Sequence, residues 1–298
     1  MSGQGKLVVV GTPIGNLGDL SPRAVEAFRA ADAVCCEDTR VTGKLLAAAG
    51  VSRPLVRCDE NVIGARAAGL VDRVLAGETL AFASDAGMPG VSDPGQVLVD
   101  AARDAGVAVE VIPGPVACVT ALVSSGIPCE HFFFEGFLPR KAGEQRRRLQ
   151  RLAMVPGALL FYESPHRVAS TLTVIAEVFP AREAALCREL TKLHEEVLRA
   201  PAPELAGIIS ARDQVKGEVV LVVAPPSEEE LAEGVARMAA GAASGGVAET
   251  VPSPDEALRA DIVSGLADGE SANALAKRLA QKYSRRKREV YALILSMQ

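Results

Sequence analysis

Residues 6–22 read KLVVVGTPIGNLGDLSP, and this stretch decides how the rest of the sequence is interpreted. Lys6 to Val10 is a short apolar run typical of a buried strand, and three glycines follow it within eight residues. Ser21 before Pro22 predicts a helix N-cap followed by the first helical position. A strand, a glycine-rich loop and a helix in this order predict an α/β unit whose loop lets a ligand approach the backbone closely.

Further apolar runs continue the same alternation. Residues 33–36, 79–83 and 107–112 are predicted strands, and helices are expected at about 42–49, 66–75 and 96–105. The strands are almost continuously apolar, which is typical of parallel strands covered on both faces. The first hundred or so residues therefore predict a doubly wound α/β domain.

The remainder of the chain predicts a second α/β layer and a helical end. A helix at 116–125 precedes predicted strands at 131–134, 158–162, 184–188 and 218–223. Ser227 and Ser253 each open a capping box, and Gly241 to Gly246 has the composition of a flexible linker. The expected division is residues 6–113, 114–226, 227–252 (acidic helix and linker) and 253–298 (small helical unit).

Composition limits the class of protein. The 298 residues suffice for about two domains, and 4% aromatic content without Trp predicts aliphatic cores. No apolar run approaches the ~18 residues of a membrane span, and the N-terminal run is too short for a signal peptide. Six cysteines lie without metal-ligand spacing, so we expect no metal, no membrane and a reducing, cytoplasmic location, with the thiols as small buried residues.

Two loops are candidates for a ligand site. The loop after residues 6–10 has the wrong glycine spacing for a dinucleotide fingerprint and lacks the Lys-Ser/Thr of a P-loop. The second loop, residues 84–95, is rich in Gly, Pro and Asp and also follows a strand. Loops at the carboxyl edge of one parallel sheet form the crevice where ligands bind. Glu37 and Asp38 end another strand, which leaves a dinucleotide enzyme open; they could equally form a helix cap and an internal ion pair.

Ordered sequence blocks across residues 7–223 resemble a known family. The chain is similar to the bacterial 16S ribosomal RNA (cytidine-2′-O-)-methyltransferases, which form a branch of the tetrapyrrole methylase superfamily. The blocks that carry the resemblance are residues 10–17 (VGTPIGNL), 36–40 (CEDTR), 83–87 (ASDAG), 92–95 (SDPG), 113–115 (PGP), 135–139 (EGFLP), 161–164 (FYES), 188–192 (RELTK) and 216–218 (KGE).

The resemblance implies the fold, the cofactor and the substrate. It implies a two-domain α/β class III methyltransferase with a parallel-sheet N-terminal domain, a mixed-sheet second domain and a small helical C-terminal unit. It also implies a homodimer, S-adenosylmethionine between the domains, and 16S ribosomal RNA or the small ribosomal subunit as substrate. By position, the cofactor would contact Thr12, Pro13, Ile14, Asp85, Pro89, Val91, Thr120, Ala121, Tyr162, Leu190 and Gly217. Residues 58–61 (CDEN) lack the histidines often found there, so this stretch is not expected to supply a base.

Methyl transfer to a ribose hydroxyl needs alignment of donor and acceptor and is helped by a proton acceptor. The candidates are Glu37, Asp38, Glu163 and His166; a structural role for His166 stays open. Lys192 and Arg167 could contact phosphate or lie at the solvated surface.

Two basic clusters are expected to contact RNA despite the net charge of −5. The first comprises Arg140, Lys141, Arg146, Arg147 and Arg148. The second comprises Arg285, Arg286, Lys287 and Arg288, in the first turn of a last helix capped by Ser284, with Val290, Leu293, Ile294 and Met297 as its buried stripe. Cations there oppose the helix dipole, which an anionic partner would offset. With the helix predicted at 271–280, the unit resembles a helix-turn-helix.

Three function classes remain. The first is a ribose methyltransferase of small-subunit ribosomal RNA. The second is a methylase of a tetrapyrrole or another small molecule, which would not need the basic helical unit. The third is an RNA-binding module without catalysis, for which the long loops at the sheet edge have no purpose.

Overall fold

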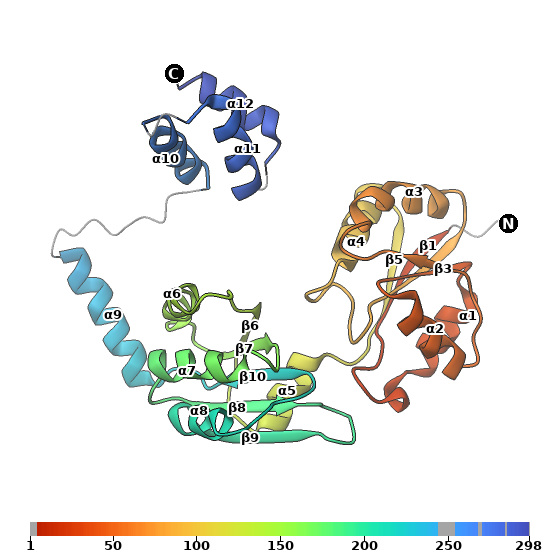
Figure 1. The fold of residues 1–298 in the computed structure, drawn as a ribbon. Helices are drawn as coiled ribbons and strands as arrows, with labels where there is room; N and C mark the ends of the chain where they lie inside the picture. Colours follow the sequence, from red (N-terminus) through yellow and green to blue (C-terminus); the bar gives the residue numbers. More distant parts are fainter. Residues whose placement is uncertain (1–4, 244–253, 268–269, 284, 298) are drawn as a thin grey trace. The chain divides into compact units, whose positions relative to one another are not determined.

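The computed structural model describes residues 5–243, 254–267, 270–283 and 285–297. It consists of two compact units, Met1–Leu231 and Ala232–Gln298, which are described separately (Figure 1). The first unit contains two sheets and the second contains helices. The finer division into four ranges stays a prediction.

The first sheet has five parallel strands in the order β3-β2-β4-β1-β5. The strands are β1 (Lys6–Val10), β2 (Ala33–Cys36), β3 (Leu55–Arg57), β4 (Thr79–Ala83) and β5 (Ala108–Ile112). The predicted strands at 6–10, 33–36 and 79–83 are confirmed at these bounds, and β5 begins one residue later than expected. β3 was not predicted, because three partly exposed residues carry too little periodicity.

Helices cover both faces of this sheet. They are α1 (Pro22–Ala30), α2 (Thr39–Ala48), α3 (Ile63–Leu75) and α4 (Gly95–Asp104), with the 3-10 turn η1 (Leu17–Asp19) after β1. α1 and α2 pack on one aliphatic core, and α3 and α4 on the other. The Ser21 hydroxyl accepts the Ala24 N–H at 3.1 Å, which confirms the predicted cap. α2 begins three residues earlier than predicted because Asp38 is its N-cap.

The second sheet is mixed, in the order β6-β7-β10-β8-β9. The strands are β6 (Phe132–Phe137), β7 (Ala158–Glu163), β8 (Glu183–Arg188), β9 (Glu196–Pro201) and β10 (Val219–Val223). β6 and β7 are parallel, whereas β10 is antiparallel to β7 and β8, and β8 to β9. β9 was not predicted, since charged residues and Pro201 interrupt its apolar pattern. The predicted fold class is thereby confirmed.

One face of the second sheet packs against α6 (Ala142–Leu152), α7 (Val168–Val178) and α8 (Ala202–Ser210). The other face packs against α5 (Ala117–Ser125) and against Ile14, which comes from the loop after β1. The two sheets therefore share an apolar cluster at Ile14, and this shared cluster borders the site described below.

The predicted linker at Gly241–Gly246 is wrong at its start. α9 (Glu228–Ala243) continues through Ala243, and residues 244–246 lie outside the described residues. The capping box at Ser227 is confirmed, because its N–H donates to Glu230 at 2.9 Å and its hydroxyl accepts the Glu230 N–H at 3.1 Å. Ser253, expected to open the second capping box, also lies outside the described residues.

The second unit contains α10 (Pro254–Ala267), α11 (Ala272–Lys282) and α12 (Lys287–Leu295). Ser271 caps α11, and Val290 and Ile294 of α12 are buried among Leu258, Leu275 and their neighbours, with Leu293 and Met297 partly buried beside them. The buried stripe is therefore confirmed.

The predicted start of α12 is wrong. The helix begins at Lys287 with Arg286 at the N-cap position, and Ser284 lies outside the described residues. The Arg285 N–H donates to the Ala280 carbonyl at 3.0 Å, so Arg285 belongs to the turn that follows α11. Lys287 and Arg288 alone of the four cations lie in the first helical turn, together with Glu289.

The chain crosses from the first sheet to the second at a direct backbone contact. A Cβ added to Gly114 would lie 2.7 Å from the Cα of Gly11, and one added to Gly11 would lie 2.6 Å from the Cα of Gly114. Both positions therefore require glycine. The Gly11 N–H also donates to the Ile112 carbonyl at 2.9 Å, which fixes the end of β1 beside the end of β5.

We expect Gly114→Ala to lower the free energy of unfolding by about 1–3 kcal/mol, because the added methyl group must displace backbone. Urea denaturation measures this. Gly69→Ala is the matched control: Gly69 is exposed within α3 with nothing near its Cβ position, and alanine there should be neutral or stabilising by up to about 1 kcal/mol. Equal stability of Gly114→Ala and wild type would contradict the contact.

Candidate functional site

A cavity of about 590 Å³ lies in the first unit, where the carboxyl-end loops of the first sheet meet strands of the second. This volume falls in the range of about 300–1,000 Å³ typical of small-molecule sites. The first sheet contributes the loops after β1, β2, β4 and β5, including Ile14, Glu37 and Asp85. The second sheet contributes Phe137, Tyr162 and Val220, among others.

Six of the predicted cofactor contacts line this cavity, although they come from distant parts of the chain. They are Ile14, Asp85, Val91, Tyr162, Leu190 and Gly217. The other five predicted contacts, Thr12, Pro13, Pro89, Thr120 and Ala121, do not form its wall.

Thr12 and Thr120 have structural partners instead. Thr12 is buried, and its hydroxyl donates towards the carbonyls of Ser84 at 3.3 Å and Gly87 at 3.2 Å. Its N–H donates to the Gly87 carbonyl at 2.9 Å, so Thr12 ties the first loop to the second. The Thr120 hydroxyl donates to the Val116 carbonyl within α5, and Ala121 is fully buried.

The second loop is shaped by Asp93, which the sequence analysis did not assign. Its carboxylate accepts the N–H groups of Gly90 at 2.8 Å and of Gly95 at 2.8 Å, and that of Val91 at 3.3 Å. Ser92 and Gly87 adopt positive φ angles of 63° and 83°. The pattern SDPG was a signal for such a turn, because Asp commonly accepts backbone hydrogen bonds two residues onwards.

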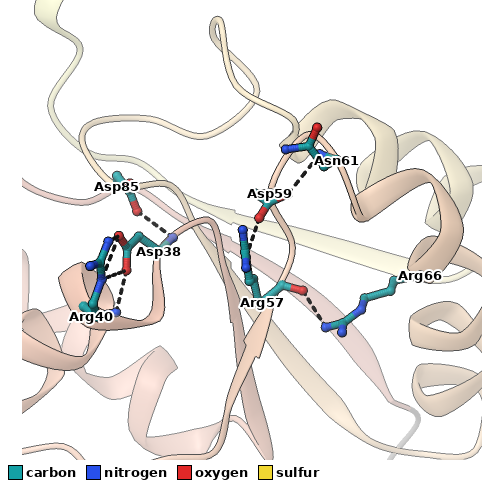
Figure 2. A network of polar contacts seen from close by, with 7 residues as sticks. All are labelled: Asp38, Arg40, Arg57, Asp59, Asn61, Arg66 and Asp85. Carbon is teal, nitrogen blue, oxygen red and sulfur yellow. Dashed lines mark hydrogen bonds and ion pairs between the residues drawn. The ribbon is translucent and has the colours of Figure 1, made fainter.

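Two hydrogen bonds link Asp85 to the Glu37–Asp38 pair. The Asp85 N–H donates to Glu37 Oε1 at 3.3 Å, and the Asp38 N–H donates to Asp85 Oδ1 at 3.0 Å. Figure 2 shows the second of these bonds. Burial raises the pKa of both carboxyl groups, so each binds a proton more readily than a free carboxylate. Both residues line the cavity.

Asp38 is fully engaged elsewhere. Its Oδ1 accepts the Arg40 N–H at 2.8 Å, and its Oδ2 accepts Arg40 Nη2 at 2.6 Å (Figure 2). The hydrogen bonds from Arg40 hold the pKa of Asp38 well below its usual range. Asp38 does not line the cavity. The helix-cap and ion-pair interpretation is therefore the one that the geometry supports for Asp38.

Glu163 and His166 are also unsuited to proton transfer in the cavity. The Glu163 side chain is buried and accepts the Thr171 hydroxyl at 2.7 Å and the Ser164 N–H at 2.7 Å, with Arg167 at 3.3 Å. His166 is exposed in the turn before α7 and does not line the cavity. Glu163 lines the cavity with its carboxylate already bound by these partners, whereas Glu37 lines the cavity and burial raises its pKa.

In the loop after β8, the two residues on either side of Leu190 adopt an unusual backbone conformation. Glu189 and Thr191 adopt positive φ angles of 51° and 64°, a conformation that non-glycine residues rarely adopt. Lys192 fixes this loop, because its ammonium contacts Glu189 at 2.8 Å and Glu218 at 3.0 Å. Lys192 is thus an internal ion-pair partner, and Leu190 is buried in the shared apolar cluster beside Ile14.

Residues 57–61 form a separate polar network (Figure 2). Asp59 pairs with Arg57 and accepts the Asn61 N–H at 2.9 Å, and Arg66 donates to the Arg57 carbonyl at 2.7 Å. None of these residues lines the cavity.

The first basic cluster is divided in its roles. Arg148 forms a two-bond ion pair with Glu135 at 2.5 and 2.6 Å, and Arg146 pairs with Glu177. Lys141 lies 3.5 Å from Glu144. Arg140 and Arg147 are exposed and form no ion pair with any residue that the structure describes.

The second basic cluster is more open. Arg285 pairs with Asp255, whereas Arg286, Lys287 and Arg288 are exposed and have no ion-pair partner among the described residues. Unpaired cations in the first turn of a helix lower its stability. An anionic partner would offset this cost.

The described part of the chain contains neither a metal-ligand cluster nor a bilayer-spanning helix. No cluster of three or more His, Cys, Asp or Glu side chains there could hold a metal ion. None of the helices among the same residues combines the length and apolar character that a bilayer crossing demands.

Residues 6–206 match the sequence profile of the Tetrapyrrole (Corrin/Porphyrin) Methylases. The chain belongs to the tetrapyrrole methylase family. The fold agrees: the chain is similar to the methyltransferase CobJ (TM-score 0.56, 20% identity, 74% of this chain and 94% of the other). It is also similar to uroporphyrin-III C-methyl transferase from Thermus thermophilus in complex with S-adenyl homocysteine (TM-score 0.53, 19% identity, 74% and 97%).

Curated relatives within this methylase family share one name. A Xylella fastidiosa protein called ribosomal RNA small subunit methyltransferase I is 46% identical over 235 residues, covering 78% of this chain and 86% of its own. A Synechocystis protein of the same name is 37% identical over 297 residues, covering 99% of both chains. The second match includes the C-terminal unit.

We expect Glu37→Gln to stabilise the free protein at neutral pH. The raised pKa of Glu37 contributes stability below the ordinary Glu pKa of about 4.3, and this contribution is lost as pH rises through the folded-state value. The amide of the variant keeps an acceptor for the Asp85 N–H but carries no charge. The difference in free energy of unfolding, variant minus wild type, should therefore increase between pH 4 and pH 7 in urea titrations.

Glu110→Gln is the control of opposite sign. A hydrogen bond from Lys6 lowers the pKa of Glu110, so its stabilising contribution is present at neutral pH and lost as pH falls. This variant should lose stability relative to wild type at pH 7 and approach it at low pH. If the free-energy difference changed with pH in the same direction in both variants, the inference that the charged form of Glu37 destabilises the folded protein would be contradicted.

Proposed function

We propose that this protein transfers a methyl group from S-adenosylmethionine to the ribose 2′-oxygen of a cytidine in 16S ribosomal RNA, within the small ribosomal subunit. The observation that carries the proposal is the match to the Synechocystis ribosomal RNA small subunit methyltransferase I along 99% of both chains. The match includes the basic C-terminal unit as well as the methylase fold. The charge of the cavity supports the same function.

The cavity wall suits S-adenosylmethionine, whose sulfonium and ammonium groups are cationic. Its charged residues are all acidic: Glu37, Asp85, Asp93, Glu163 and Glu218. The apolar part of the wall, which includes Ile14 and Leu190, suits the methylene groups of the methionine moiety and the adenine ring. The lack of a side chain at Gly87 lets the second loop lie close to Ile14 and Pro115, because a Cβ there would lie 3.2 Å from Ile14 Cγ2 and 3.3 Å from the Pro115 carbonyl oxygen.

When bound, S-adenosylmethionine supplies an activated methyl group whose carbon–sulfur bond breaks as the bond to the ribose oxygen forms. The residues of the chain align the two partners, which accounts for much of the rate in such reactions. Asp85 of the second loop and Leu190 of the loop after β8 would hold the cofactor in the cavity. Glu37 accepts the proton of the 2′-hydroxyl, since its raised pKa makes it a stronger base than an exposed carboxylate.

The RNA contacts are assigned to the cations that lack internal partners. Arg140 and Arg147 in the first unit, and Arg286, Lys287 and Arg288 in the second, are exposed and have no ion-pair partner among the described residues. Phosphate contacts of this kind dominate protein–RNA affinity and weaken with added salt. Arg146, Arg148 and Arg285 keep their internal acidic partners and contribute less.

The second candidate function is methylation of a tetrapyrrole or other small molecule, because the CobJ neighbour shares the fold. The unpaired cations at the start of α12 disfavour this candidate. They lower the stability of the helix, and a small-molecule substrate would not offset that cost as RNA phosphates would.

The proposal also includes a homodimer, as the family resemblance implies, and a cytoplasmic location, where ribosomal subunits are available. Light scattering that gives the mass of one chain would contradict the dimer.

The experiment is methyl transfer from labelled S-adenosylmethionine. Purified protein is incubated with small subunits whose 16S RNA lacks the modification, with naked 16S RNA, or with precorrins. Digestion to nucleosides should place the label in 2′-O-methylcytidine. Label in the precorrin alone, or in no RNA sample, would contradict the proposal.

Glu37→Gln should lower kcat by about 100-fold or more at saturating cofactor, which is the lower range for loss of a general base. Glu37→Asp should recover part of the rate. Asp38→Asn is the matched control, because Asp38 caps α2 outside the cavity. It should cost stability and leave kcat within a few fold. An unchanged kcat in Glu37→Gln would remove Glu37 from the mechanism.

Replacing Lys287 and Arg288 together by Ala should weaken binding to small-subunit RNA and reduce the slope of log K against log salt by about 1.4–1.8. The affinity for S-adenosylmethionine should stay unchanged. Lys44→Ala with Arg103→Ala removes the same charge from exposed positions on α2 and α4 and serves as the control. Equal slopes for both double variants would argue against a specific RNA contact at α12.

A further inference from the structure

One aromatic side chain at the cavity is exposed. Phe137, the last residue of β6, lines the cavity, yet 57% of its surface is accessible to solvent. Its ring centroid lies 5.8 Å from that of Tyr162 in an edge-to-face arrangement, and Phe134 lies 4.8 Å from Tyr162. In a chain with 4% aromatic residues and no Trp, this group of three rings, two of which line the cavity, is an unusual concentration.

A β-bulge turns Phe137 towards the cavity. The register of β6 against β7 shifts between Phe134 and Gly136, so Phe134 pairs with Leu160 and Phe137 pairs with Tyr162. Leu160 and Tyr162 share one face of β7, and the extra residue therefore brings both phenylalanines to that face. Gly136 makes this possible with a φ of 77°. Bulges are frequent where a side chain must be redirected at a site.

Two arginines fix the bulge and the turn after it. Glu135, the residue next to Gly136 in the bulge, is held by the two-bond ion pair with Arg148 of α6. Arg167 donates to the carbonyls of Leu138 and Pro139, both at 3.0 Å. Phe137 is thus an exposed aromatic ring at the cavity on a segment that these ion-pair and hydrogen-bond contacts hold in place.

An exposed cation follows Phe137 closely in the sequence. Arg140 follows Phe137 by three residues in the chain, is exposed and lacks an ion-pair partner among the described residues. An aromatic face beside an unpaired cation suits a nucleotide, whose base stacks while its phosphate is contacted. A ribose hydroxyl inside a folded RNA reaches a cavity most easily when its nucleotide is turned out of the strand.

We propose that Phe137 is the stacking platform for the base of the target nucleotide, turned out of its strand, and that this contact sets the ribose over the cavity. The inference rests on the proposed function and adds a substrate contact that the family match does not assign. Tyr162, which also lines the cavity, contacts the Phe137 ring and is itself contacted by Phe134. The exposed position of Phe137 favours the base that arrives from solvent over the enclosed cofactor.

The test compares Phe137→Ala, Phe137→Leu and Phe137→Tyr in the full-length protein. Initial rates on small subunits lacking the modification give kcat and KM for the RNA, and calorimetry gives the affinity for S-adenosylmethionine. Base–aromatic stacking predicts a loss of kcat/KM of about 5- to 100-fold for Phe137→Ala. Phe137→Leu, which keeps apolar volume without a π face, should lose nearly as much, and Phe137→Tyr should stay within a few fold of wild type. The cofactor affinity should not change.

Phe133→Ala is the matched control. Phe133 pairs with Leu159 on the opposite face of β6, is 37% exposed and does not line the cavity. It should keep the wild-type kcat/KM. Retention of wild-type kcat/KM by Phe137→Ala, while wild type methylates RNA, would overturn the stacking role and leave the proposed function standing. A matching loss of cofactor affinity would reassign Phe137 to the cofactor, and a changed oligomeric mass would reassign it to an interface; both overturn the inference. Absence of RNA methylation by wild type would overturn both proposals.

Discussion

The backbone contact between Gly11 and Gly114 is the constraint on which the rest of the first unit depends. It holds the loop after β1 against the segment that leaves β5, at the point where the chain passes from one sheet to the other. Thr12 then ties that loop to Gly87, and Ile14 enters the apolar cluster of the second sheet. A side chain at either glycine would separate these loops. The close approach of the two backbones therefore helps to place the loops that line the cavity.

The cavity is electrostatically unfavourable when empty. The Asp85 N–H donates to Glu37, the Asp38 N–H donates to Asp85, and burial raises the pKa of both Glu37 and Asp85. The free protein thus keeps acidic groups partly out of water and close to each other, with a cost in stability. A cationic ligand would relieve this cost. The same principle applies at α12, where unpaired cations in the first turn would be relieved by phosphate.

Regular elements and the crevice were predictable from the sequence because they depend on local patterns. Continuous apolar runs located β1, β2 and β4, and two irregular loops located the cavity edge. Short or charged strands such as β3 and β9 gave too weak a signal. The start of α12 was misjudged because Arg285 still bonds to the Ala280 carbonyl of α11 and Arg286 takes the N-cap position. The sequence could not predict which carboxylate faces the cavity either. Glu37 and Asp38 are adjacent in sequence, yet Asp38 binds Arg40 outside the cavity and Glu37 lines it. The pairing of Arg148 with Glu135 depends likewise on a bulge that the sequence does not reveal.

The central claim is that loops at the carboxyl edge of the first sheet and the second sheet together hold one cationic nucleoside cofactor. A crystal structure of the protein with S-adenosylhomocysteine tests it most directly. We expect the ligand inside the cavity, in contact with Ile14, Leu190 and Gly217, with its amino group or ribose hydroxyls on Asp85 or Glu37. A ligand bound elsewhere on the chain, or one whose amino group and ribose both avoid these carboxylates, would contradict it.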